Sequence, residues 1–312
     1  MDIDYLLLLQ QFRENINDAL TPFMESVSLF SITFLFLVPV FIYWCIDKRS
    51  ALLVFFCTMT GSVLNSIVKL TACVYRPWIR DPRIIPAGNA IETATGYSFP
   101  SGHTVTATTI YGPLALQTWR RYRWLAVLLV IAILLTAFSR NYLGVHTPQD
   151  VLVGLLVSVL SIWLIYTLFS YVSRHPEKED LLLLIGFLFG FVELLYISLK
   201  TYPLDYADGK LLVDPQRMMD DAYANVAMFQ ALIVGRYLER RWIQFRPTGF
   251  NLRGILLCVV GLVPVVLMIQ TLTPALDGVL GAHWGHYTAS AIMVLYCVAL
   301  FPLIIKLIYR KQ

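Results

Sequence analysis

Long apolar stretches separated by short polar connections are the feature that most constrains this chain of 312 residues. Hydrophobic residues make up 58% of the chain and charged residues only 14%, far from the average of soluble proteins. An apolar stretch of about 20 residues is long enough to cross the hydrocarbon core of a membrane as a helix. The pattern therefore predicts an all-α, polytopic membrane helix bundle.

About nine stretches approach this length, which predicts about nine transmembrane helices. They are residues 27–46, 51–74, 104–119, 124–142, 149–172, 181–199, 222–238, 253–273 and 287–307. The seventh is short and carries Asn225, Gln230 and Arg236, so the alternative there is an interfacial or re-entrant helix. Residues 1–24 mix leucines with polar residues, which favours a short helix lying at the membrane interface, with a frayed end as the alternative.

The distribution of Lys and Arg predicts how the chain is oriented in the membrane. Alternate loops and the C-terminal tail carry 15 basic residues, and the opposite face carries 8. Because cytoplasmic loops are enriched in basic residues, the N-terminus is expected outside and the C-terminus in the cytoplasm. The net charge of +4 follows from these loops and indicates no nucleic-acid partner. The chain holds no Asn-x-Ser/Thr sequon, which favours a bacterial plasma membrane over the endoplasmic reticulum.

Three short polar clusters interrupt the apolar sequence, and in the expected topology all three lie at the outer ends of spans. They are Lys69 to Arg76-Pro77, Pro100-Ser101-Gly102-His103, and Ser139-Arg140 followed by His146 and Asp150. Charges at membrane depth are costly and usually functional. Lys69 and Arg76 are seven residues apart, so two helical turns would place both cations on one face if the helix continues that far.

The residue types in these clusters suit the handling of a phosphate. A helix that starts after Ser101 and Gly102 offers free backbone N–H groups and the positive end of its dipole to an anion, and Gly102 allows close backbone approach. His146 precedes a predicted helix start, and the carboxylate of Asp150 can hold one imidazole nitrogen as N–H and leave the other as a nucleophile. Taken singly, each residue has a simpler explanation, as a helix cap, a turn residue or a lysine that snorkels to the interface. Taken together and in this order, the residues favour a single site.

Together the three clusters resemble the signature of the type 2 phosphatidic acid phosphatase superfamily. That superfamily includes lipid phosphate phosphatases, undecaprenyl pyrophosphate phosphatases, glucose-6-phosphatase and, more distantly, vanadium haloperoxidases. The resemblance covers about residues 51–172, the five-helix catalytic portion, and is weak beyond it. Together with the expected spans, it divides the chain into an N-terminal interfacial segment over 1–24, catalytic phosphatase helices over 25–175 and accessory transmembrane helices over 176–312.

The resemblance also implies a role for each signature residue. His146 attacks phosphorus and becomes phosphohistidine, Asp150 orients it, and His103 protonates the leaving group and later activates water. The phosphate oxygens are expected to contact the remaining signature residues, which are Lys69, Arg76, Ser101, Gly102 and Arg140. No metal and no cofactor are implied. The expected enzyme is a phosphoric monoester hydrolase acting on a lipid or small-molecule phosphate at the outer face of the membrane.

Several alternatives stay open at this stage. The substrate is a lipid or polyprenyl phosphate, a soluble sugar phosphate as for glucose-6-phosphatase, or the scaffold serves a phosphotransferase or transporter. His283 and His286 could form a metal pair, but an interfacial polar and aromatic belt is the favoured explanation. The five cysteines show no paired spacing and suggest neither a disulfide framework nor a zinc site. Glu193, a carboxylate inside an apolar stretch, is expected to pair with Gln230 or a hydroxyl.

Overall fold

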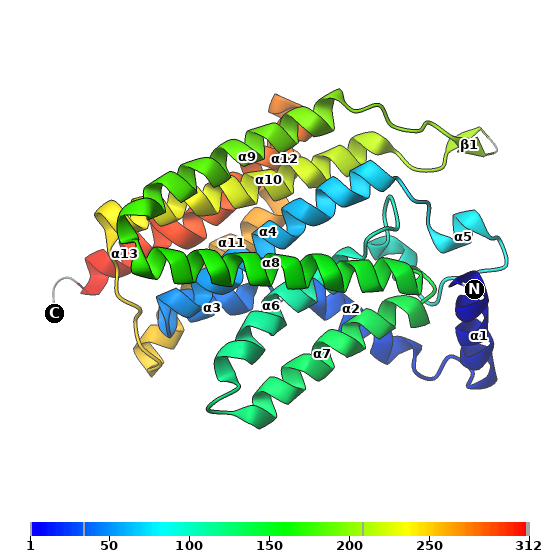
Figure 1. Ribbon diagram of the computed structural model, residues 1–312, viewed down its shortest axis with the longest axis horizontal. Helices are drawn as coiled ribbons and strands as arrows, with labels where there is room; N and C mark the ends of the chain where they lie inside the picture. The colour runs from blue at the N-terminus through cyan, green and yellow to red at the C-terminus, as the bar shows by residue number, and fades with distance from the viewer. Residues whose placement is uncertain (1, 34, 208, 310–312) are drawn as a thin grey trace. The chain divides into compact units, whose positions relative to one another are not determined.

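The computed structural model describes residues 2–33, 35–207 and 209–309. Nearly all of the ordered elements in these residues are helices (Figure 1), which confirms the all-α fold class. A single short hairpin in the described residues pairs β1 (Tyr206–Ala207) with β2 (Lys210–Leu211) in antiparallel register. The α-helices are α1 (Asp2–Asn15), α2 (Thr21–Thr33), α3 (Leu37–Cys45), α4 (Lys48–Ala72), α5 (Pro77–Arg80), α6 (Gly102–Thr118), α7 (Arg123–Tyr142), α8 (Pro148–Arg174), α9 (Glu179–Leu199), α10 (Pro215–Leu238), α11 (Leu252–Leu280), α12 (Ala282–Leu295) and α13 (Phe301–Tyr309).

Short helical turns connect some of these elements. The 3-10 turns are η1 (Ala90–Thr93) and η2 (Pro176–Lys178), and the π-helical turns are η3 (Glu239–Ile243) and η4 (Tyr296–Leu300).

Within the described residues, six helical segments are long and apolar enough to cross a membrane, and a seventh span results if the bent pair α2 and α3 counts as one. The chain is therefore a multi-pass membrane protein. Two expected spans fall outside this set. The expected span 104–119 corresponds to α6, which ends at Thr118 and has only 17 residues, and the expected span 222–238 lies in α10, which also carries Asp220, Asp221 and Arg236. The count of nine spans and the orientation in the membrane stay predictions.

The chain divides into two compact units. The first comprises residues 1–36, 64–163 and 201–218, and the second comprises residues 37–63, 164–200 and 219–312. All eight predicted site residues belong to the first unit. The boundaries at residues 24 and 175 drawn from the sequence stay predictions.

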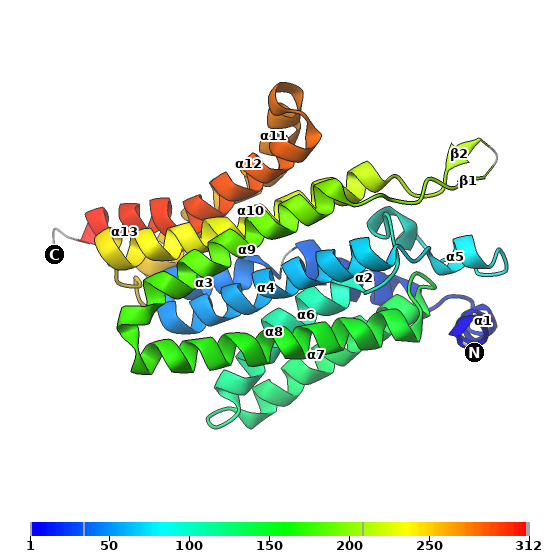
Figure 2. The ribbon, with the colours of Figure 1, turned by 45° about the horizontal axis from the view of Figure 1, so that its top comes forward.

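In the first unit, α6 and α7 run side by side, α2 packs against both, and α1 packs against α7 (Figures 1 and 2). The short connection from α7 to α8 is buried, and Gly144 adopts a φ of +73°, which glycine accepts without strain. A hydrophobic cluster underlies this connection and includes Met24, Ala87, Tyr142, Leu143 and Val145. The packing therefore fixes the loop that carries His146.

In the second unit, α9 and α10 lie side by side in opposite directions (Figure 2). Ion pairs join one end of this hairpin, where Arg236 Nε lies 2.8 Å from Glu179 and Lys48 Nζ lies 2.6 Å from Glu239. Helices α11 and α12 pack against each other and are separated by Gly281, whose φ is +79°. Trp44 Nε1 donates to the carbonyl of Cys297 at 2.7 Å and so ties α3 to η4.

Candidate active site

The segment after α4 does not follow the helical geometry expected from the sequence. Helix α4 ends at Ala72, Cys73 has a φ of +48°, and Arg76 is extended at φ −63° and ψ 153°. The expectation that Lys69 and Arg76 share one continuous helix face is therefore wrong. A positive φ at a non-glycine residue stops the helix, and Arg76 instead reaches the site from an extended segment.

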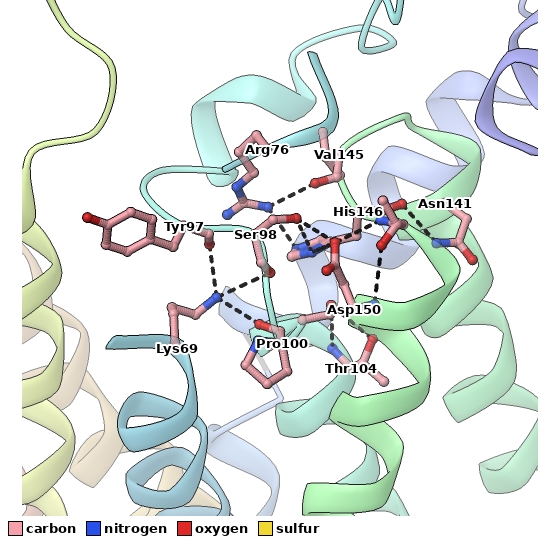
Figure 3. Close-up of polar contacts among 12 residues, drawn as sticks. Lys69, Arg76, Tyr97, Ser98, Pro100, Thr104, Asn141, Val145, His146 and Asp150 are labelled. Carbon is pink, nitrogen blue, oxygen red and sulfur yellow. Dashed lines mark hydrogen bonds and ion pairs between the residues drawn. The ribbon is translucent and has the colours of Figure 1, made fainter. Parts of the chain in front are cut away.

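Lys69 holds the loop that leads into the second polar cluster (Figure 3). Its ammonium group donates to three backbone carbonyls, at 3.0 Å to Tyr97, 3.4 Å to Ser98 and 2.7 Å to Pro100. An ammonium has three N–H donors, so these contacts engage its full capacity. Lys69 therefore fixes the approach to the start of α6.

Arg76 contacts the same loop and also reaches His146. Its Nε donates to the carbonyl of Gly96 at 3.0 Å, and its Nη1 donates to the carbonyl of Val145 at 3.0 Å. The same Nη1 lies 2.8 Å from His146 Nε2. Because a guanidinium can only donate, His146 Nε2 is the acceptor and carries the lone pair.

The opposite imidazole nitrogen faces Asp150, as expected from the sequence. His146 Nδ1 lies 3.3 Å from Asp150 Oδ2 and is the N–H of this tautomer. The same carboxylate oxygen accepts from the Ser98 hydroxyl at 2.5 Å and from the backbone N–H of Thr147 at 2.8 Å. Helix α8 begins at Pro148, as predicted, so Asp150 both caps this helix and orients the imidazole.

The surroundings of His146 favour its neutral form. The residue is only 1% exposed, and it lies in the loop between α7 and α8. Burial, together with the charges of Arg76 and Arg140, lowers the pKa of His146 well below its usual value. The imidazole is therefore unprotonated at neutral pH, which is the state that a nucleophile requires.

The second cluster caps α6 as expected. Ser101 is the N-cap, and its hydroxyl accepts from the backbone N–H of Thr104 at 3.5 Å. A Cβ added to Gly102 would meet only the Asn65 side chain, at 3.8 Å, so protein packing does not demand glycine here. His103 is buried, and its Nε2 has no hydrogen-bond partner among the described residues. This helix start is thus open to a ligand on chemical grounds.

Arg140, in the last turn of α7, is fully buried. Its Nη1 donates to the hydroxyl of Ser28 in α2. Its Nε and Nη2 have no partner in the part of the chain that the structure describes. Its backbone carbonyl accepts from the N–H groups of Val145 and His146, each at 3.2 Å. Arg140 therefore shapes the His146 loop and also offers unsatisfied donors beside it.

Three residues that contact the site were not identified from the sequence. Ser98 binds Asp150, Ser28 binds Arg140, and Asn141 Nδ2 donates to the carbonyl of His146 at 2.9 Å. Ser28 and Ser98 lie outside the three polar clusters, and Asn141 lies between two residues of the third. No regular spacing in the sequence distinguishes these three residues. Asn141 is adjacent to Arg140 in the chain, which is the only signal that could have suggested it.

The two histidines considered for a metal pair each contact a carboxylate. His283 Nδ1 lies 2.5 Å from Asp220, and His286 Nε2 lies 3.3 Å from Asp277. Within residues 2–33, 35–207 and 209–309, no group of three or more His, Cys, Asp or Glu side chains comes together in a way that could hold a metal ion.

Comparison with known proteins relates this site to a family. Residues 50–174 match the model of the PAP2 superfamily. Sphingosine-1-phosphate phosphatase 2 of Homo sapiens is 32% identical over 162 residues, which cover 49% of this chain and 37% of that protein. Undecaprenyl-diphosphatase of Sulfolobus acidocaldarius is 35% identical over 85 residues, which cover 27% of this chain and 38% of that protein.

Phosphatidylglycerophosphatase B of Bacillus subtilis is 27% identical over 126 residues, which cover 38% of this chain and 58% of that protein. The matched stretches thus span between about a third and three fifths of the length of these relatives. No solved structure matches the chain. The matched segment contains all three polar clusters and every predicted site residue, and over this segment the chain is similar to the PAP2 superfamily, that of the type 2 phosphatidic acid phosphatases.

Proposed function

We propose that this protein is a membrane phosphatase that hydrolyses lipid or polyprenyl phosphates through a phosphohistidine on His146. One observation carries the proposal: His146 Nε2 holds a lone pair, its Nδ1 faces Asp150, and the buried Arg140 offers unpartnered donors beside the same loop. An oriented neutral imidazole next to a buried cation suits nucleophilic attack on an anionic phosphoryl group.

The reaction divides into two steps. In the first, His146 Nε2 bonds to phosphorus, the bond to the leaving oxygen breaks, and His103, which enters this step as the imidazolium, gives that oxygen a proton and becomes neutral. In the second, His103 takes a proton from water, the water oxygen bonds to phosphorus, and the P–N bond breaks to release phosphate. Because one displacement is divided into two, each proton transfer is made to or from a single imidazole, that of His103.

The cations neutralise the charge that the phosphoryl oxygens carry in each transition state. Arg140 acts directly through Nε and Nη2, and Gly102 and Ser101 add the donors of the α6 N-terminus. Arg76 Nη1 leaves His146 Nε2 when phosphorus approaches and turns to a phosphoryl oxygen. Lys69 keeps the Pro100 loop in place through its carbonyl contacts. Positioning and charge neutralisation are what phosphoryl transfer chiefly requires.

Rapid-quench experiments with phosphate-labelled substrate test the mechanism. We expect wild type to trap acid-labile labelled protein and His146→Ala to trap none and to lose turnover. His103→Ala should form phosphoenzyme best from substrates with good leaving groups, since these need little protonation. His175→Ala, in the exposed loop after α8, is the matched control and should behave as wild type. Normal turnover in His146→Ala would refute the assignment.

A substrate panel tests the class of substrate. The names of three relatives suggest its members, which are sphingosine-1-phosphate, undecaprenyl diphosphate and phosphatidylglycerophosphate. Glucose-6-phosphate is added as a soluble substrate. We expect the lipid and polyprenyl substrates to be hydrolysed in detergent and in liposomes, and preferential hydrolysis of the sugar phosphate would contradict this substrate class.

A further inference from the structure

Glu193 is a buried carboxylate in the second unit, and the phosphatase chemistry does not use it. It lies in α9 within a segment apolar enough to cross a membrane, and it is 2% exposed. The other buried residues of α9 are Gly190, Leu194 and Ile197, which share its helix face. Carboxylates within membrane segments are functional candidates by default.

This face of α9 packs against α10. A Cβ added to Gly190 would lie 2.8 Å from the Gln230 side chain, so the two helices approach closely there. Further along, the Ser198 hydroxyl lies 2.8 Å from the Tyr223 hydroxyl. Glu193 lies three residues from Gly190 and so shares the face of α9 that approaches α10 there. Its side chain is therefore enclosed where the two helices meet near Gly190.

Gln230 is not the partner that the sequence suggested for Glu193. Its Nε2 donates to the carbonyl of Phe187 at 2.8 Å, and its Oε1 accepts from the Tyr287 hydroxyl at 2.5 Å. Neither carboxylate oxygen of Glu193 has a hydrogen-bond partner among the residues that the structure describes. The expectation of a Gln230 pair is thus wrong, because the amide is already committed to α9 backbone and to α12.

The charged groups of the packed helices lie toward their ends. At one end, Arg236 binds Glu179 and Glu239, while Asp180 binds Arg240 and Arg241. At the other end lie Lys200, Arg217, Asp220 and Asp221, all beyond the Ser198–Tyr223 contact in the sequence. Helix α12, which reaches α10 through Tyr287, adds His283, bound to Asp220, and His286, bound to Asp277. In each ion pair described for these groups, the partner is a residue other than Glu193.

We propose that Glu193 is a proton-binding site of the second unit and that it holds a proton in the conformation described here. An ionised carboxylate without partner or countercharge is strongly disfavoured in apolar surroundings, and one bound proton removes that charge. The proton comes from water and returns to water, so no other bond forms or breaks.

Side chains that can exchange protons lie in a row from the solvent toward Glu193. His283 and Asp220 keep 27% and 12% of their side chains exposed and bind each other. The His283 ring stacks on Tyr223, with centroids 5.1 Å apart, and the Tyr223 hydroxyl contacts Ser198. Ser198 lies five residues from Glu193, which is about 7.5 Å along the helix axis. Protons are thus expected to reach Glu193 from the Asp220 end of α10.

Carbodiimide labelling of the wild-type protein is the first test. A hydrophobic carbodiimide reacts with protonated carboxyl groups in apolar surroundings, and mass spectrometry locates the adduct. We expect Glu193 to be labelled at neutral pH and labelling to decline at alkaline pH, whereas a water-soluble carbodiimide should label the exposed Glu177. Labelling of Glu193 by the water-soluble reagent alone would overturn the assignment, because it would show an ionised, solvated carboxylate.

Infrared spectroscopy is the second test and needs no access for a reagent. The C=O stretching band of a protonated carboxyl should be present in wild type, lost in Glu193→Gln and kept in Glu177→Gln. Tyr223→Phe should slow the deuterium exchange of this band. Glu193→Gln should keep phosphatase turnover, which verifies its fold and separates this site from His146. A spectrum unchanged by Glu193→Gln would overturn the assignment, and if that variant does not fold, the wild-type labelling profile decides.

Discussion

Ser28→Ala is the change that best tests how the buried Arg140 is held. Ser28 is 3% exposed and accepts a hydrogen bond from Arg140 Nη1. Two other nitrogens of that guanidinium, Nε and Nη2, have no partner in the described part of the chain. Ser28 is thus the side chain that sets which way the unpartnered donors of Arg140 point.

The expected loss of kcat/KM follows from the type of hydrogen bond that is removed. A hydrogen bond to a charged group contributes about 1.5–3 kcal/mol. Since about 1.4 kcal/mol corresponds to a tenfold change, losing the whole contribution in the transition state would lower kcat/KM by about ten- to a hundredfold. Burial still confines the Arg140 side chain after the change, so we expect the lower end, about tenfold.

The assay measures kcat/KM and the inhibition constant of vanadate, which can adopt the geometry of the transferring phosphoryl group. Both should worsen by a similar factor in Ser28→Ala, and Ser28→Thr should restore them. Ser31→Ala is the matched control, because Ser31 is also buried in α2 but its hydroxyl donates to the backbone carbonyl of Ser28 and not to Arg140. In an Arg140→Ala background, Ser28→Ala should add no further loss of vanadate affinity.

A purely structural role for Ser28 would give a different pattern. It would lower the melting temperature and leave kcat/KM and vanadate inhibition within twofold of wild type. That result would refute the view that Ser28 positions a phosphate-binding group.

Three further predictions follow from the site and the topology. Because burial lowers the pKa of His146, which we propose attacks in its neutral form, the loss of kcat/KM at acid pH should have its midpoint below about 6.5, the ordinary histidine value. An acid-side midpoint at or above that value in a titration of kcat/KM would contradict the neutral nucleophile. Hydrolysis should survive excess EDTA and be blocked by vanadate, and strict dependence on added magnesium or zinc would contradict charge neutralisation by Arg76 and Arg140. In a cysteine-free background, a membrane-impermeant maleimide added to intact cells should label Glu92→Cys and not Tyr122→Cys, and the reverse pattern would place the site in the cytoplasm. Glu92 is exposed, whereas a Cβ at the neighbouring loop position Gly88 would be strained at φ +52°.

The sequence predicted most of the helices and the contact between His146 and Asp150, because both depend on local chemistry. The lengths of the apolar stretches predicted most of the helices that could cross a membrane, and Thr147 and Pro148 predicted the start of α8. The four-residue offset between His146 and Asp150 predicted their contact, since the two flank one helix start. Such patterns need no knowledge of the remaining fold.

The path of the chain between Lys69 and Arg76 could not be predicted in the same way. Seven residues match two turns of a helix, but Cys73 adopts a left-handed conformation and the helix ends at Ala72. The contacts of Ser28 and Ser98 were also hidden, because they depend on tertiary packing between segments far apart in the sequence. Ser28 even lies outside the segment that matches the family model.

The three cations are not equally available to the proposed phosphate in the conformation described here. Lys69 and Arg76 donate to the carbonyls of the loops that carry the Pro100 and His146 clusters, so their charge first shapes the site. Arg140 alone among the three has buried guanidinium nitrogens without a described hydrogen-bond partner. Since an unsatisfied buried donor is costly, we expect an incoming phosphate to bind at Arg140 first. Arg76 then has a reason to leave His146 Nε2, because a phosphoryl oxygen is a charged acceptor and the imidazole nitrogen is a neutral one.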